Sequence, residues 1–146
     1  TLSYFFTKDK IRSENDLTKI EGKYNSYSFK KGNRGTLMYY FWLNEYKCTF
    51  QIPANYISYF NRNRFIANVK KNDKLNIYIS NNQVTNLNSK EKIFVQHIGK
   101  QNLIFLNKMN SIKTEKSYSE VYFSIIIFIA GILYYVIRKT IWKPKE

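Results

Sequence analysis

The chain has few of the residues on which metalloproteins and disulfide-bonded proteins depend: its 146 residues include one cysteine, Cys48, and one histidine, His97. A disulfide framework needs an even set of cysteines, and a zinc site usually needs three or four cysteine or histidine ligands, so both are excluded. The sequence also lacks a phosphate-binding loop, a dinucleotide-binding glycine motif and an H-E-x-x-H motif. We therefore expect no cofactor and no bound metal ion.

Candidate catalytic side chains are scarce as well. Cys48 and His97 could form a nucleophile–base pair, but Cys48 falls on an all-apolar strand face, which predicts a buried, unreactive thiol. The only aspartates are Asp9, Asp16 and Asp73, and the turn-forming sequence around Asp73 explains that residue without catalysis. The sequence therefore predicts a protein that is not an enzyme, with no small-molecule substrate evident.

The chain also has few acidic residues: it contains 10 Asp and Glu and 24 Lys and Arg, which gives a net charge of +14. Such an excess is typical of nucleic-acid-binding proteins. However, the commonest residue types are those with codons rich in A and T, the basic residues are scattered, and only five of them are Arg. Arg is the preferred bidentate ligand of phosphate and guanine. The charge thus favours a solvated or membrane-proximal basic surface over nucleic-acid binding.

The longest uncharged run is residues 121–137, seventeen residues that would extend about 25 Å as a helix. This length is near the lower limit for crossing a bilayer. Residues 117–120 have the S-x-x-E spacing of a capping box and place the helix start near Tyr118. We predict a transmembrane helix over residues 118–138, in preference to a helix buried in a soluble core, because the run is apolar on all sides. Its representative span residues are Val121, Ile125, Ile129, Gly131 and Ile137.

The charges that flank the span predict its orientation. Arg138 and the basic tail, residues 139–146, hold four basic residues against three in the twenty residues before the span. Positive charge favours the cytoplasmic side, so we expect a bacterial inner-membrane protein with a cytoplasmic C-terminus and an extracytoplasmic domain. A tail-anchored protein with a cytosolic domain is the alternative. Residues 1–19 form an N-terminal segment that could be the end of a preceding membrane helix, a short strand or a remnant near a cleavage site.

Residues 20–106 alternate between apolar and polar side chains, which is typical of strands. The aromatic content of 18% excludes a disordered chain. The predicted fold is mainly β: a small antiparallel barrel or sandwich of six to seven strands with a short helix. It is followed by a polar connector over residues 107–117, which could itself be helical, and by the transmembrane helix. The predicted strands span residues 21–30, 37–43, 46–52, 74–80, 93–98 and 103–106, and the predicted short helix spans residues 54–61.

The clearest prediction is a hairpin over residues 37–52. If Asn44 and Glu45 form a two-residue loop, Phe41 pairs with Cys48 and the apolar side chains share one face. Glu45 fits such a tight turn poorly, which leaves a slightly longer loop open. On the opposite face, the same register places Trp42 opposite Lys47, a spacing that would permit a cation–π contact.

That opposite face supplies the candidate partner-binding residues. Met38, Tyr40, Trp42 and Lys47 would form an aromatic and basic stripe able to contact a partner protein, lipid headgroups or single-stranded nucleic acid, unless the short helix or the connector covers it. Two further candidates, Arg62 and Arg64, lie in a predicted basic loop that could contact lipid phosphates or simply be solvated. A final prediction assigns small residues of the span, Gly131 among them, to contacts with other helices.

Two functions remain open from the sequence. The first is a membrane-anchored, non-enzymatic interaction module, an accessory subunit of a bacterial envelope complex that contacts membrane lipid and a protein partner. The second is an OB-like domain that binds single-stranded nucleic acid, because three strands, a short helix and further strands follow one another in that order. Salt separates the two hypotheses, since nucleic-acid affinity falls steeply with ionic strength.

Three features together resemble small uncharacterised bacterial membrane proteins with an extracytoplasmic β-domain beside one or two membrane helices. They are the aromatic strand of residues 39–41 leading into a hairpin, residues 69–79, and the strand–connector–span ending. Such proteins often have Gly-Asp where this chain has Asn72 and Asp73. The resemblance covers most of the chain and implies a membrane protein with its β-domain outside the cytoplasm. It implies no activity and no functional residues.

Overall fold

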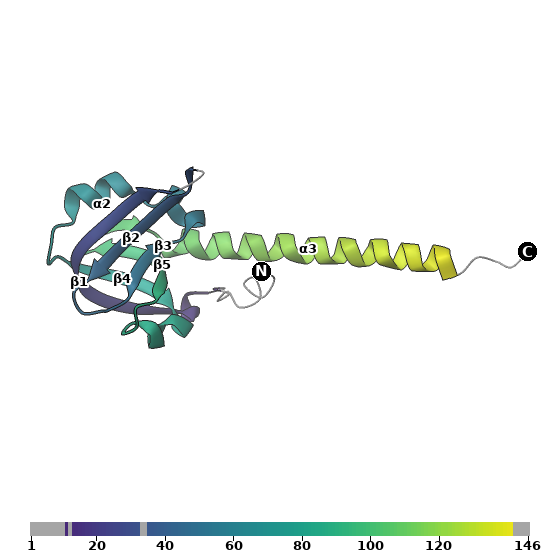
Figure 1. Cartoon of the computed structure of the whole chain (residues 1–146), viewed down its shortest axis with the longest axis horizontal. Coiled ribbons are helices and arrows are strands. Elements are labelled where there is room, and N and C mark those ends of the chain that lie inside the picture. Colours follow the sequence, from purple (N-terminus) through teal and green to yellow (C-terminus); the bar gives the residue numbers. More distant parts are fainter. Residues whose placement is uncertain (1–10, 12, 33–34, 142–146) are drawn as a thin grey trace, which may run out of the picture.

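The computed structural model of the chain describes residue 11, residues 13–32 and residues 35–141, without the side chains of 116–124 and 139–141. A single 3-10 turn, η1 (Glu14–Asp16), leads into six strands, with short helices between some of them and one long helix at the end (Figure 1). The elements that follow are β1 (Leu17–Lys31), β2 (Leu37–Leu43), β3 (Thr49–Ile52), η3 (Ala54–Tyr59), α2 (Arg62–Asn68), β4 (Lys74–Ser80), η4 (Asn81–Asn86), β5 (Lys92–Lys100), β6 (Leu103–Leu106) and α3 (Lys108–Ile141).

Five of the strands close into a ring. β1 pairs with both β2 and β4, β2 pairs with β3, β4 pairs with β5, and a parallel pairing of β3 with β5 closes the circle. β1 serves two neighbours because it is long and changes register between Tyr24 and Ser26, where a strand can bend. A closed five-stranded barrel with a short helix after its third strand follows the plan of the OB-fold. The predicted mainly β fold is confirmed, and of the two predicted architectures the barrel is the observed one.

The barrel core follows from the alternation of the strands. In β2 the buried residues are Tyr39, Phe41 and Leu43, and the residues between them are half-buried. Helix α2 lies across one end of the barrel, where Phe65 inserts among the rings of five aromatic residues at centroid distances of 5.3–6.4 Å. Those five residues are Tyr24, Phe29, Phe41, Phe60 and Phe105. Because aromatic side chains bury the largest apolar areas, this cluster supplies much of the stability of the barrel.

Two local predictions are wrong. The hairpin pairs Phe41 with Phe50 rather than with Cys48, because its loop spans residues 44–48 instead of two residues. A shift of two residues leaves every side chain on its predicted face. The predicted basic loop that contains Arg62 is helix α2, which begins where the Asn61 side chain accepts a hydrogen bond from the Arg64 backbone N–H at 3.1 Å.

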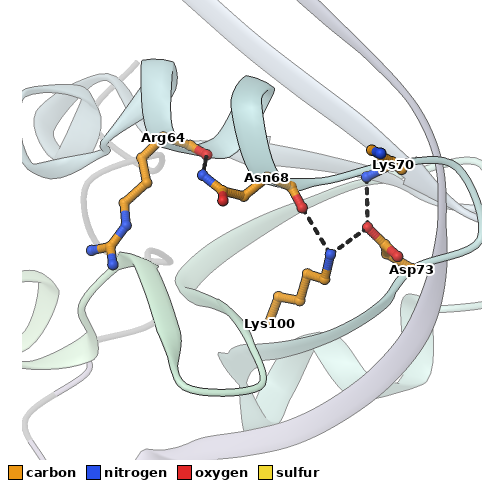
Figure 2. Close-up of polar contacts among 5 residues, drawn as sticks. All are labelled: Arg64, Asn68, Lys70, Asp73 and Lys100. Carbon is orange, nitrogen blue, oxygen red and sulfur yellow. Dashed lines mark hydrogen bonds and ion pairs between the residues drawn. The ribbon is translucent and has the colours of Figure 1, made fainter.

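The turn between α2 and β4 is fixed by one carboxylate (Figure 2). Asp73 Oδ2 accepts hydrogen bonds from the Lys70 backbone N–H and from Lys100 Nζ, both at 2.6 Å. Lys100 Nζ also donates to the Asn68 carbonyl at 2.8 Å, and the Asn68 side chain donates to the Arg64 carbonyl at 2.8 Å. These contacts tie the end of β5 to the end of α2 and to the start of β4.

The same turn holds Asn72 in the left-handed region, with φ of 70°. Asparagine tolerates this conformation better than most residues, and glycine adopts it without strain. The Asn72 N–H also donates to the Tyr24 carbonyl at 2.7 Å, and the Tyr24 N–H donates to the Asp73 carbonyl at 2.8 Å.

Replacing Asp73 with alanine should lower the free energy of unfolding by about 2 kcal/mol, the usual size of a charge-assisted hydrogen-bond loss, and Tm by roughly 10 °C. The Asp73 and Lys100 side chains are only 26% and 21% exposed, so solvent screens their ion pair little. The hydrogen bond from Lys100 lowers the pKa of Asp73 from its ordinary 3.8. The stabilisation is therefore present above about pH 4 and is lost as the pH falls through the folded-state pKa.

Thermal unfolding from pH 7 to pH 2.5 measures this effect. The gap in Tm between the wild type and Asp73→Ala should narrow at acidic pH. The control is Glu21→Ala, which removes the exposed ion pairs of Glu21 with Lys19 and Lys74 and should change Tm much less at pH 7. Equal losses in the two variants at pH 7 would show that the turn does not depend on Asp73.

Candidate functional site

One outward surface of the barrel is shared by strands β2, β3 and β5. The pairing aligns Tyr40 with Gln51 and Gln51 with Phe94, and in the next row it aligns Thr49 with Lys92. We call this surface the outer face, and it consists of Met38, Tyr40, Trp42, Thr49, Gln51, Lys92 and Phe94. Lys92 is exposed and the other six side chains are half-buried, so three aromatic side chains and a cation are partly open to solvent.

Side-chain contacts hold two of these aromatic residues in place. Lys92 Nζ lies 5.5 Å from the centre of the Tyr40 ring, within the range of a cation–π interaction. Trp42 Nε1 donates a hydrogen bond to Thr49 Oγ1 at 3.2 Å. A surface of this kind can stack planar groups on its rings and pair its cation with an anion.

The structure brings together three of the four residues predicted for the hairpin stripe. Met38, Tyr40 and Trp42 share the outer face, as their alternation predicts. Lys47 lies instead in the loop after β2, and Thr49 rather than Lys47 is the residue hydrogen-bonded to Trp42. The predicted pairing of Trp42 with Lys47 is therefore wrong, because it depended on the two-residue loop.

The two predicted arginines belong to a different part of the molecule. Arg62 lies at the first turn of α2, and its guanidinium carbon is 5.8 Å from the ring centres of both Phe29 and Tyr39. It therefore covers the aromatic cluster at the end of the barrel rather than standing free in a loop. Arg64 is exposed on the same short helix. Neither arginine belongs to the outer face.

Sequence reasoning missed two outer-face residues, Lys92 and Phe94. Their alternation with buried Ile93 and Val95 is visible in the sequence and predicts that they point outward. What the sequence does not reveal is the parallel pairing of β3 with β5, which joins segments about forty residues apart. Without that pairing, Lys92 could not be placed beside Tyr40.

The base of helix α3 is a packed part of the domain. Tyr56 Oη donates to Glu115 Oε1 at 2.5 Å, and Ser111 Oγ donates to the Gln96 carbonyl at 2.9 Å. Ile112 is buried beside this cluster. Burial and the neighbouring Glu115 carboxylate both raise the pKa of Tyr56. The first two turns of α3 are thus fixed to η3 and β5, and the predicted helix start near Tyr118 is wrong, because the helix begins at Lys108.

Beyond its base, α3 leaves the barrel as a single long helix (Figure 1). Of the predicted span residues, Ile125, Ile129 and Ile137 are exposed, and an added side chain at Gly131 would meet no atom within 4 Å. The Val121 side chain lies outside the described residues. Among the residues that the structure describes, no helix combines the length and the apolar character needed to cross a membrane. Residues 1–10, which contain part of the predicted N-terminal segment, and residues 142–146 of the basic tail are outside that description.

Cys48 has neither the exposure nor the low thiol pKa that a nucleophilic cysteine needs. The Cys48 side chain is fully buried in the barrel core, and burial raises its thiol pKa to about 11, so the thiol stays protonated at neutral pH. His97 packs edge-on against Tyr78 at 5.1 Å, and its Nδ1 is buried without a hydrogen-bond partner among the described residues. Burial and the nearby Lys108 ammonium lower the pKa of His97. Within the described part of the chain, no group of three or more His, Cys, Asp or Glu residues could hold a metal ion.

Comparison of the chain with protein-family models, with curated proteins and with solved structures finds no match.

Proposed function

We propose that the chain is a membrane-anchored, non-enzymatic interaction module, in which helix α3 holds the barrel at a bilayer. The observation that carries this proposal is the run of apolar side chains on α3, which stand exposed all around the helix; Phe128, for example, is 71% exposed. Burying an Ile, Leu or Phe side chain away from water stabilises it by about 1.5–3 kcal/mol. A lipid environment would cover all sides of such a helix at once.

The sequence supports a span longer than the described side chains. The uncharged run begins at Val121, whereas the first described side chain of the run is Ile125. Arg138 and the basic tail then follow, and the positive-inside rule favours a cytoplasmic C-terminus. The barrel would stand on the extracytoplasmic side of a bacterial inner membrane. There the outer face would bind a protein partner, and the chain would act as an accessory subunit of an envelope complex.

Alkaline carbonate extraction of membranes tests this anchor directly. The full chain should stay in the membrane pellet, and protease added outside intact cells should remove the barrel. A chain that washes off would overturn the proposal.

A second candidate function, the binding of single-stranded nucleic acid, is favoured by a different observation. The barrel has the strand order of an OB-fold, and strands 2 and 3 of that fold form its usual oligonucleotide-binding surface. In this chain the corresponding strands contribute Tyr40 and Trp42, and the adjacent strand contributes Lys92 and Phe94. Aromatic rings beside a cation suit base stacking and phosphate contact.

The double variant Tyr40→Ala, Trp42→Ala decides whether this surface binds oligonucleotides. If it does, the variant should weaken binding to a fluorescent dT oligonucleotide by at least about tenfold, since each stacked base contributes about 1–3 kcal/mol. Wild-type affinity should also fall steeply between 50 and 200 mM salt. Tyr27→Ala is the control. Tyr27 is an exposed aromatic residue of β1, but the β1 residues that align with Trp42 and Tyr40 are Ser26 and Ser28. Absent binding at low salt would remove this candidate.

A further inference from the structure

Helix α3 leaves the barrel on a side with a distinctive rim. Figure 1 shows the end of β1 and the start of β2 on the side from which α3 projects. The register aligns Lys31 of β1 with Leu37 of β2, and η3 follows β3 at the same edge and packs against α3. We call this edge the α3-side rim, formed by Lys30, Lys31, Leu37 and η3.

The α3-side rim combines exposed lysines with exposed apolar and aromatic side chains. Lys30 and Lys31 are exposed, and Leu37 and Tyr59 are exposed apolar or aromatic residues, with Tyr59 47% exposed. Residues 25–37 and 53–61 contain no Asp or Glu. Within the described part of the chain, Glu115 accepts the Tyr56 hydroxyl of η3, and Glu14 pairs with Lys108 at the start of α3. Cations with neighbouring aromatic and aliphatic side chains are the composition that membrane interfaces favour.

The docking of α3 sets the distance between this rim and the apolar run. Glu115, which is bonded to η3, precedes Val121 by six residues, or about 9 Å of helix at 1.5 Å per residue. The polar headgroup layer occupies about 5–7 Å on each side of the hydrocarbon core. If the run at Val121 enters the core, η3 therefore lies at the outer edge of the headgroups, within side-chain reach.

We propose that the α3-side rim is a lipid-contact surface, with Lys30 and Lys31 pairing with anionic phospholipid headgroups and Tyr59 entering the interface. This inference depends on the proposed anchoring of α3. The barrel would then be fixed against the membrane surface rather than swinging on a flexible stalk, since Tyr56, Ser111 and Glu115 hold the base of α3. The outer face would consequently be presented at a constant height and angle to any partner.

Headgroup-specific quenching in nanodiscs tests the proposal on the full chain. A fluorophore on Ser58→Cys, an exposed position of η3, would report the rim. One on Lys71→Cys would report the turn between α2 and β4, and Figure 1 shows that turn at the end of the barrel away from α3. The native Cys48 is fully buried and should not label. A nitroxide-headgroup lipid should quench the Ser58 probe strongly and the Lys71 probe weakly in discs containing phosphatidylglycerol.

Matched charge variants test whether Lys30 and Lys31 cause the quenching of the Ser58 probe. Lys30→Gln with Lys31→Gln should lower the ratio of quenched to unquenched Ser58 probe, by about fivefold per lysine. Lys70→Gln with Lys71→Gln, an equal charge change at the far end, should leave the Ser58 signal unchanged. The wild-type signal should weaken at 0.5 M salt.

The outcomes separate this inference from the anchoring on which it depends. A chain that fails to enter nanodiscs contradicts the anchor and the rim contact together. A chain that enters, but whose Ser58 and Lys71 probes are quenched equally, overturns the rim contact alone. Equal quenching of the Ser58 probe in phosphatidylglycerol and phosphatidylcholine discs also overturns it, because the contact would then not depend on charge.

Discussion

Replacing Phe65 with alanine should lower the free energy of unfolding of the barrel by about 3–5 kcal/mol. The Phe65 side chain is 1% exposed, and five aromatic rings surround it. Alanine would leave a cavity that the barrel end could not close easily, because those rings are held by β1, β2, β6 and the segment between η3 and α2. Small domains have about 5–15 kcal/mol of total stability, so much of the reserve would be lost.

Ile66→Ala is the matched control for Phe65→Ala. Ile66 is the next residue of α2 and is 40% exposed, so the same substitution there removes little packing and changes stability by at most roughly 0.5 kcal/mol. Urea unfolding followed by circular dichroism measures both variants. If the two substitutions lower the free energy of unfolding equally, Phe65 does not anchor helix α2 to the barrel end.

The strands were the part of the fold most accessible from the sequence. Residues 74–80 alternate cleanly, and β4 has those same bounds. The hairpin shows where alternation stops being informative: a register two residues away keeps the same faces, so the pattern could not choose between a two-residue loop and the observed five-residue loop. The poor fit of Glu45 to a tight turn was the local sign of the longer loop.

Helix α2 escaped prediction for a related reason. Its seven residues bury a single side chain, Phe65, so the sequence contains no 3.6-residue apolar pattern to recognise. The available signal was Asn61, whose side chain caps the helix. In α3 the opposite error occurred. The S-x-x-E spacing at residues 117–120 indicated a helix start, but those residues lie within a helix that begins at Lys108.

Some residues of the outer face can be predicted from the sequence of a single strand, and others only from the way in which the strands pair. Tyr40 and Trp42 follow from alternation within one strand. Lys92 and Phe94 join them only because β5 runs parallel to β3 and closes the ring. Closure of the barrel thus brings Lys92 beside Tyr40. Their spacing in the sequence does not predict this contact.

Introducing arginine into the apolar run should release the chain from the membrane if α3 is a lipid anchor. We expect Ile129→Arg with Leu133→Arg to cost about 5–7 kcal/mol of insertion free energy, since one arginine at a helix centre costs about 2.5–3.5 kcal/mol. Both side chains are exposed and lie far along α3 from the barrel, so the Tm of the barrel should not change. Alkaline extraction of cells expressing each variant gives the readout.

Met109→Arg is the control that separates anchoring by lipid from a general effect of added charge. Met109 is an exposed apolar residue of the same helix, but it lies at the base beside the barrel. This variant should remain in the membrane pellet with the wild type, whereas the Ile129, Leu133 variant should appear in the wash. Release of both variants, or retention of both, would mean that the uncharged run is not the anchor. Its exposed side chains would then require a protein surface, because water alone would leave them uncovered on every side of the helix.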